Sequence, residues 1–142
     1  NHDKVKVMVS HTKGEGFGRP LLEFTTTGKP VIASGWSGQL DFLDKDKSIL
    51  VGGTLTKVDK SAAIKEMILE ESQWFTPEAA DVGRKLKNVY KQYKKTLVGA
   101  KSQRTNTLKN LTLEDMDSKV DEILSNYIPK FPKLVELNLP EL

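Results

Sequence analysis

The sequence lacks cysteine altogether, has two histidines among 142 residues, and contains no apolar run long enough to span a bilayer. Without cysteine there is no disulfide, no cysteine–zinc site and no cysteine nucleophile. The absence also fits a reducing compartment, so we expect a cytoplasmic protein. Because His2 and His11 are the only imidazoles, we do not expect a His-rich metal site. The polar start of the chain, with charges of both signs, is not typical of a signal peptide.

Acidic residues are missing from the segment between positions 83 and 113, which carries nine lysines or arginines. Two interpretations are open: a solvated helix face, or a surface that meets an anionic membrane or nucleic acid. Only Tyr90 and Tyr93 accompany these cations, so single-stranded nucleic acid is the less favoured partner.

Hydrophobic patterning predicts an α/β fold with a parallel sheet. We expect strands at 4–10, 29–34 and 48–53, a helix from about Arg19 that ends at Gly28, and a short helical turn within 35–46. Three strands make a small sheet for this class. The edge of the first strand should therefore need a partner, either a further domain or a second copy of the chain.

Helices are expected in the remainder of the chain. One should run from Asp59 or Ser61 to Glu71, one should begin at Thr76-Pro77-Glu78, and one should follow a capping box at Thr112 and Asp115. The tail 128–142, with three prolines, should be extended. Apolar residues at helical spacing form one stripe at Val82, Leu86, Val89, Tyr93 and Leu97, and another at Met116, Val120, Ile123 and Tyr127.

Gly14, Gly16 and Gly18 follow the first predicted strand. A dinucleotide fingerprint would need its third glycine where Arg19 stands, and a P-loop would need Gly-Lys followed by Ser or Thr, so both motifs fail. The N–H groups of such a loop, together with those at a helix start, can still hold a phosphate. Pro20 has no N–H and cannot be one of the donors.

The stretches "EGFGRPLLE" (15–23) and "GKPVIAS" (28–34) resemble the glutamate-x7-glutamate signature of retaining glycosyltransferases with the GT-B fold. The resemblance implies that residues 1–127 are part of a nucleotide-sugar-binding, Rossmann-like donor domain, with about three parallel strands flanked by helices. The chain would then be a C-terminal fragment that lacks the N-terminal acceptor domain and is inactive alone. The enzyme would move a sugar from a nucleotide-diphosphate sugar to an unknown acceptor with retained configuration. The resemblance implies no obligatory metal and no cofactor besides this donor substrate.

The resemblance also implies residue roles. Glu15 would be the catalytic-site carboxylate facing the donor sugar, and Glu23 would bind the ribose hydroxyls, because carboxylates accept hydrogen bonds from hydroxyls. The diphosphate would be left to N–H groups. The alternative is that both glutamates are ordinary surface acids. The full set of expected donor-binding residues is Gly16, Phe17, Gly18, Arg19, Leu21 and Glu23.

Several positions depart from the family pattern. Arg19 replaces a usual leucine and faces either the diphosphate or solvent. Asp41 stands in place of a usual glutamate. Trp36 is either a packing residue or a sugar-stacking platform, and we favour packing. His11 ends the first strand, and we favour a structural role for it.

Two rival functions stay open beside the enzyme. One is a non-catalytic module that keeps the fold and some affinity for nucleotides or sugars. The other is a basic interaction protein that uses the segment from Arg84 to Lys109 to meet nucleic acid or a membrane.

Overall fold

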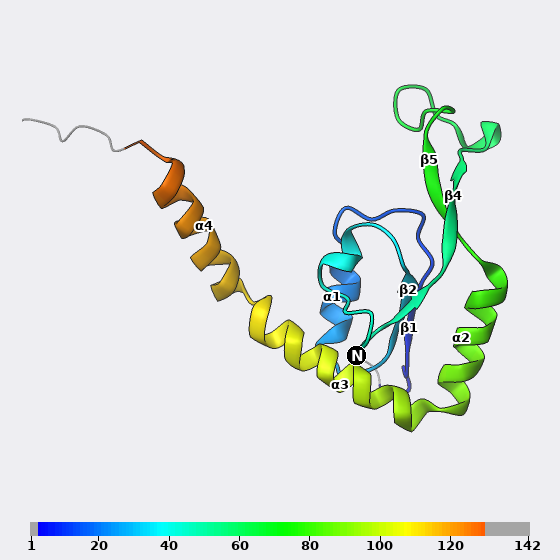
Figure 1. Cartoon of the computed structure of the whole chain (residues 1–142), viewed down its shortest axis with the longest axis horizontal. Helices are drawn as coiled ribbons and strands as arrows, with labels where there is room; N and C mark the ends of the chain where they lie inside the picture. Colours follow the sequence, from blue (N-terminus) through cyan, green and yellow to red (C-terminus); the bar gives the residue numbers. More distant parts are fainter. Residues whose placement is uncertain (1–2, 130–142) are drawn as a thin grey trace, which may run out of the picture. The chain divides into compact units, whose positions relative to one another are not determined.

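The structure is a computed structural model that describes residues 3–129. Its contacts divide the chain into one unit that ends at Leu111 and a second unit that begins at Thr112 (Figure 1). Among residues 3–129, all strands belong to the first unit, and the second unit contains the helix α4 (Leu113–Tyr127). His2 and most of the proline-containing tail lie outside the described residues.

A three-stranded parallel sheet forms the centre of the first unit. It consists of β1 (Met8–Ser10), β2 (Val31–Ser34) and β3 (Ile49–Val51), in the order β1-β2-β3. The α/β class and the parallel sheet flanked by helices are confirmed, and they are compatible with a partial Rossmann-like fold. The strands are shorter than predicted. All four residues of β2 are buried, as expected for a strand covered on both faces.

Alternate residues of β2 enter two separate cores, because successive side chains of a strand point to opposite faces. Val31 and Ala33 pack with residues of α1 (Arg19–Thr25) and of the turn that follows β2, in a cluster with Leu21, Phe42 and Leu43. Ile32 packs on the other face with Val51 and with Val89 of α2 (Ala79–Lys91). Each fully buried Val, Leu or Ile contributes roughly 1.5–3 kcal/mol relative to exposure. These two cores fix the strand register.

The segment between β1 and β2 has the predicted form. The helix α1 begins at Arg19, and Gly28 follows it with a φ of 68°, the left-handed conformation that favours glycine after a helix. A Cβ atom at Gly28 would lie 3.3 Å from the side chain of Arg104. The predicted helical turn after β2 is a 3-10 turn, η1 (Gly38–Asp41).

The predicted helix at 59–71 is wrong. An antiparallel hairpin occupies this region, with β4 (Gly53–Lys57) paired to β5 (Gln73–Pro77). Between them lie a short 3-10 turn, η2 (Lys60–Ala62), and an irregular loop. The pairing joins threonine hydroxyls across the strands, with Thr56 Oγ1 2.6 Å from Thr76 Oγ1, and it buries Phe75 to 5% exposure. Cross-strand contacts of this kind outweigh the helical propensity of the intervening alanines.

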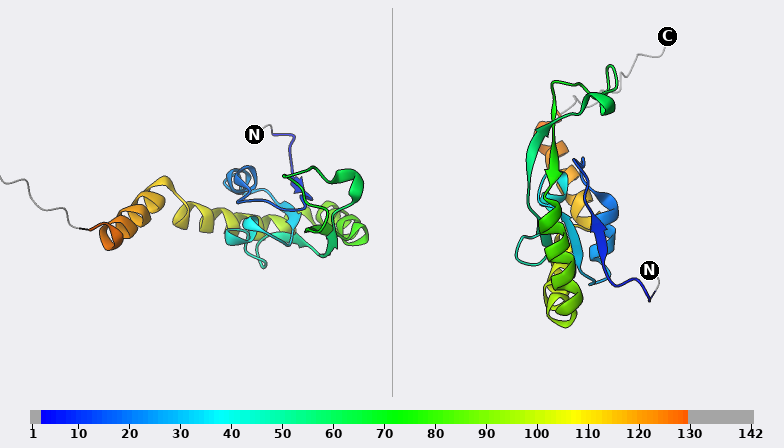
Figure 2. Two further views of the ribbon diagram at one scale, coloured as in Figure 1. Left: turned by 90° about the horizontal axis from the view of Figure 1, so that it is seen from above. Right: turned by 90° about the vertical axis from the view of Figure 1, so that its right-hand side faces the viewer.

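The long basic helix also differs from its prediction. Thr76 and Pro77 belong to β5, so Thr76 does not cap α2, which begins after Glu78. The helix then breaks at Gln92 (φ −119°, ψ 34°), and α3 (Tyr93–Asn110) continues in a new direction (Figures 1 and 2). A side-chain contact joins α3 to α1, with Thr107 Oγ1 2.8 Å from Thr25 Oγ1.

The helix α4 begins with the predicted capping box. Thr112 Oγ1 accepts the N–H of Asp115 at 3.1 Å, and the Asp115 carboxylate accepts the N–H of Thr112 at 3.0 Å. The large apolar side chains of its predicted stripe are exposed. No helix among the described residues is long and apolar enough to cross a membrane.

Candidate functional site

The glycine loop lies at the carboxyl end of the parallel sheet. Residues 11–18 follow β1, residues 35–38 follow β2, and Gly52 follows β3. Because parallel strands place their carboxyl ends together, these three segments lie at the carboxyl end of the sheet, where open α/β sheets bind ligands. The sequence predicted this placement for the loop.

Ser37 and Gly38 hold the backbone of Glu15. The Ser37 hydroxyl accepts the Glu15 N–H at 3.0 Å and donates to the Glu15 carbonyl at 2.6 Å. The Gly38 N–H donates to the same carbonyl at 3.1 Å. A Cβ atom at Gly38 would lie 2.1 Å from the carbonyl oxygen of Gly16, so only glycine allows the two loops this approach. Ser37 itself has a φ of 76°, an unusual conformation for a residue other than glycine.

The N–H groups of Gly16, Phe17 and Gly18 make no hydrogen bond within the described part of the chain. Gly18 has a φ of 85°, and its carbonyl accepts the N–H groups of Leu21 and Leu22 at the start of α1. This helix has seven residues, so an anion here would depend on the N–H groups of the loop more than on a long helix dipole.

The two signature glutamates have different surroundings. Glu15 is half-buried, and Glu23 is exposed on α1. Glu23 Oε1 accepts a hydrogen bond from Arg19 Nε at 2.7 Å, and both side chains of this ion pair are largely exposed. An exposed pair contributes only about 0–1 kcal/mol, so hydroxyl groups of a ligand can replace it. Arg19 therefore faces Glu23, an arrangement that the sequence analysis did not anticipate.

The remaining predicted residues separate into surface and core. Phe17 is exposed, and its ring centroid lies 5.1 Å from that of Phe42. The Leu21 side chain is buried in the core and its N–H is taken by Gly18, so the structure does not bring Leu21 to the loop surface. Asp41 lies exposed in η1, and His11 is exposed after β1.

The hairpin reaches the glycine loop, a contact that the sequence analysis missed. The Phe75 N–H donates to the Lys13 carbonyl at 3.1 Å, and Lys13 Nζ lies 3.5 Å from the ring centroid of Trp74. Trp36 stacks on Phe75, with ring centroids 6.1 Å apart and planes at 5°. The alternation in "GTLTK" and the β-branched and aromatic residues of "QWFTP" were the available signal for this hairpin.

Two buried oxygens beneath the loop, Thr12 Oγ1 and Gln39 Oε1, have no hydrogen-bond partner among the described residues. Both neighbour Ser34, whose hydroxyl donates to the Thr12 carbonyl at 2.8 Å and whose carbonyl accepts from Gln39 Nε2 at 2.9 Å. Unsatisfied buried groups are few in native proteins and need a specific reason.

Asp81 is the most perturbed carboxylate of the unit. The Gly52 N–H donates to Asp81 Oδ2 at 2.8 Å, Arg84 Nη2 lies 2.6 Å from Oδ1, and Lys85 Nζ lies 3.1 Å from Oδ2. Chiefly the Gly52 hydrogen bond, and then that from Arg84, lowers the pKa of Asp81 to about 2. Because it joins the end of β3 to the first turn of α2, we assign Asp81 a structural role.

No cluster of three or more His, Asp or Glu side chains in residues 3–129 could hold a metal ion. No family model matches the chain, and neither the curated proteins nor the solved structures gave a match.

Proposed function

We propose that the first unit is the donor-binding part of a retaining glycosyltransferase of the GT-B type. One observation carries the proposal. Two carboxylates, Glu15 and Glu23, flank a loop whose N–H groups at Gly16, Phe17 and Gly18 make no hydrogen bond within residues 3–129. The loop backbone is at the same time clamped by Ser37 and Gly38. A preorganised loop of this kind suits an anion that carries hydroxyl groups on both sides.

In the proposed complex, the diphosphate accepts hydrogen bonds from the loop N–H groups. The Glu15 carboxylate accepts hydrogen bonds from hydroxyls of the donor sugar, and Glu23 exchanges Arg19 for the ribose hydroxyls. In the transfer, the bond between the anomeric carbon and the diphosphate oxygen breaks, and the oxygen of an acceptor hydroxyl bonds to that carbon on the same face. The hydroxyl proton passes to the departing diphosphate. N–H groups that stabilise the departing negative charge lower the barrier.

Ligand binding tests this proposal directly, because it needs no acceptor. We would titrate the full chain by calorimetry with UDP, GDP, ADP and dTDP, and with glucose conjugates of the diphosphate that binds. Glu23→Gln should weaken the binding of both the diphosphate and its sugar conjugate about tenfold (~1.4 kcal/mol). Glu15→Gln should weaken the sugar conjugate alone.

Glu78→Gln is the matched control, because Glu78 is an exposed glutamate at the start of another helix, and it should bind as the unsubstituted chain does. Absence of binding to every diphosphate at millimolar concentration would refute the donor-site proposal.

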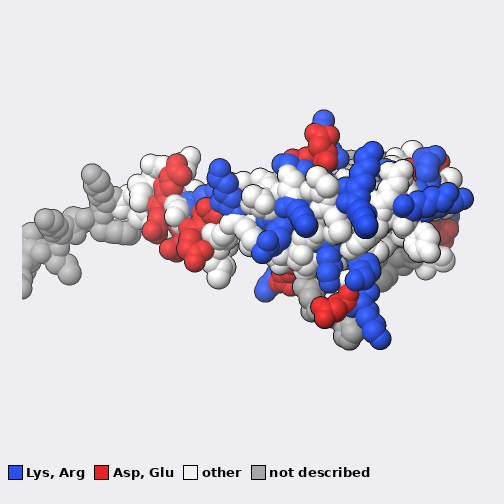
Figure 3. Space-filling view, turned by 90° about the horizontal axis from the view of Figure 1, so that it is seen from below, with Lys and Arg blue, Asp and Glu red and all other residues white. Residues whose placement is uncertain are grey.

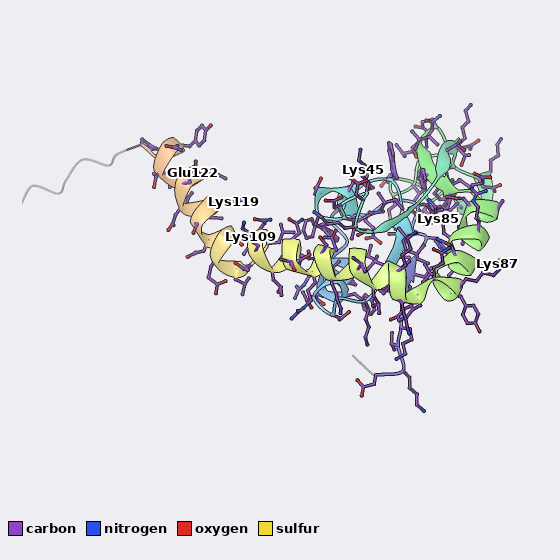
Figure 4. The ribbon with its side chains drawn as sticks, turned by 60° about the horizontal axis from the view of Figure 1, so that its bottom comes forward. Lys45, Lys85, Lys87, Lys109, Lys119 and Glu122 are labelled. Carbon is purple, nitrogen blue, oxygen red and sulfur yellow. The ribbon has the colours of Figure 1, made fainter. Side chains whose placement is uncertain are left out.

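The acid-free segment 83–113 supports a second candidate, an anion-binding surface. Lysines and arginines are spread over the face in Figure 3, and Figure 4 labels Lys85 and Lys87 on α2 and Lys109 on α3. Some of these cations are already engaged: Arg84 and Lys85 with Asp81, and Arg104 with the Thr26 carbonyl at 2.8 Å. We therefore rank this candidate second. Salt-dependent co-sedimentation with phosphatidylserine vesicles, or salt-dependent RNA binding, would favour it.

A further inference from the structure

Lys13 lies within the glycine loop, two residues before Glu15, and the hairpin contacts it twice. Its backbone carbonyl accepts the Phe75 N–H at 3.1 Å, and its ammonium group lies 3.5 Å from the ring centroid of Trp74. The backbone contact fixes the position of residue 13. The ring holds the charge without neutralising it, because a cation–π contact leaves the ammonium group ionised.

The loop has a second cation, Arg19, but that side chain is paired with Glu23. Lys13 is exposed and makes no ion pair with a carboxylate within 4 Å in the described part of the chain. Lysine has a flexible four-carbon stem and three donors, so its charge can move to a ligand without any backbone movement. A phosphate oxygen is a stronger partner for an ammonium group than the face of an indole ring.

The space beside Lys13 is open. Gly14 and Gly16 are exposed, and a Cβ atom at Gly16 would meet nothing within 4 Å. The unpaired N–H groups begin three residues after Lys13, so an anion on them lies within reach of a lysine side chain. The hairpin therefore holds the charge of Lys13 at the N-terminal end of the glycine loop, whereas the Arg19–Glu23 pair follows the loop.

We infer that Lys13 is a diphosphate-binding residue, which leaves the ring of Trp74 and donates to the ligand when a nucleoside diphosphate occupies the glycine loop. The inference depends on the proposed function and extends it to a residue outside the glutamate signature. It also makes Trp74 a reporter of occupancy, since the removal of a cation from its ring changes its fluorescence.

The test uses the full chain with Trp36→Phe, which leaves Trp74 as its one tryptophan. Lys13→Met removes the charge while the backbone contact to Phe75 remains. We expect Lys13→Met to lower the affinity for the diphosphate that binds (UDP, GDP, ADP or dTDP) about tenfold. The affinity for the matching nucleoside, which has no phosphate, should not change. The ligand-dependent change in Trp74 fluorescence should also disappear. Lys13→Arg should keep most of the affinity.

Lys57→Met is the matched control, because Lys57 is an exposed lysine of β4 in the same hairpin, and it should bind as the parent does. Equal diphosphate affinity of the parent and Lys13→Met would overturn the inference and leave the proposed function intact. If no nucleotide binds but inorganic pyrophosphate binds in a Lys13-dependent way, the anion site stands and the nucleotide-sugar function fails. If pyrophosphate does not bind either, both proposals are overturned. Unchanged near-UV circular dichroism shows that Lys13→Met is folded.

Discussion

The Ser37 hydroxyl is 3.0 Å from the Glu15 backbone nitrogen and 2.6 Å from the Glu15 carbonyl oxygen, so one side chain both accepts from and donates to the same residue. Twenty-two positions separate the two residues. Ser37 therefore couples the loop after β2 to the loop after β1, and it fixes the backbone from which the Glu15 carboxylate extends.

Substitution of Ser37 by alanine should loosen this coupling. Two hydrogen bonds to part-buried backbone groups disappear, each with a net contribution of about 0.5–1.5 kcal/mol. We expect a loss of about 1–3 kcal/mol of stability in urea unfolding and weaker binding of sugar-linked diphosphates. Ser102→Ala, at an exposed position of α3, should lower neither quantity. Equal behaviour of the two variants would show that the hydroxyl does not hold the loop.

Two glycine-to-alanine substitutions should act in opposite directions. Gly38→Ala would place a Cβ atom 2.1 Å from the Gly16 carbonyl, so the loops must separate, at a cost of roughly 1–3 kcal/mol. Gly83→Ala lies in the exposed interior of α2 with nothing within 4 Å of the added atom, and it should stabilise by roughly 0.5–1 kcal/mol. Denaturation midpoints of both variants would check this, and a stable Gly38→Ala protein would contradict the close approach.

Asp81 should make stability depend on acid pH. Its pKa is lowered from 3.8 in the unfolded chain to about 2 in the folded one, so the folded state favours the ionised carboxylate. The stabilisation is fully present above about pH 4 and is lost as the pH falls toward 2.

Asp81→Asn should therefore be less stable at pH 7, with a flatter decline in stability between pH 4 and 2. Urea unfolding at a series of pH values measures this decline, and Asp117→Asn on the exposed face of α4 is the control. Parallel pH profiles for Asp81→Asn and the parent chain would exclude Asp81 as the source of the slope.

Thr112→Ala should destabilise α4 alone. It removes the capping hydroxyl, which contributes about 1 kcal/mol to a helix. Because α4 belongs to a separate contact unit, we expect faster amide hydrogen exchange in residues 113–117 and unchanged exchange in β2. Ser118→Ala serves as the control. Faster exchange in β2 as well would mean that the two units unfold together.

Local patterns predicted the part of the fold that carries the glycine loop. The three strands of the parallel sheet, the helix before Gly28 and the capping box at Thr112 each depend on nearby residues, and all were found. The hairpin was missed because "SAAIKEMILEE" favours a helix by composition, whereas the observed pairing joins Gly53 to Pro77 across that whole segment. Such pairing depends on contacts distant in sequence, which local propensity does not include.

The glycine loop was identified from sequence, but its surroundings were not. No local sequence signal at Gln92 predicts the end of α2, since neither glycine nor proline occurs there. The pairing of Arg19 with Glu23 follows from four-residue helical spacing and was within reach of sequence reasoning. The approach of Lys13 to Trp74 required the hairpin and could not be foreseen without it.

Gln103 of α3 is buried, with 2% of its surface exposed, and it forms hydrogen bonds with backbone groups of the segment between η1 and β3. Its Nε2 donates to the Phe42 carbonyl at 2.7 Å, and its Oε1 accepts the Asp44 N–H at 3.0 Å. The partners lie 61 and 59 positions earlier in the chain. During synthesis from the N-terminus, α3 must therefore emerge from the ribosome before this segment can form its native hydrogen bonds to Gln103.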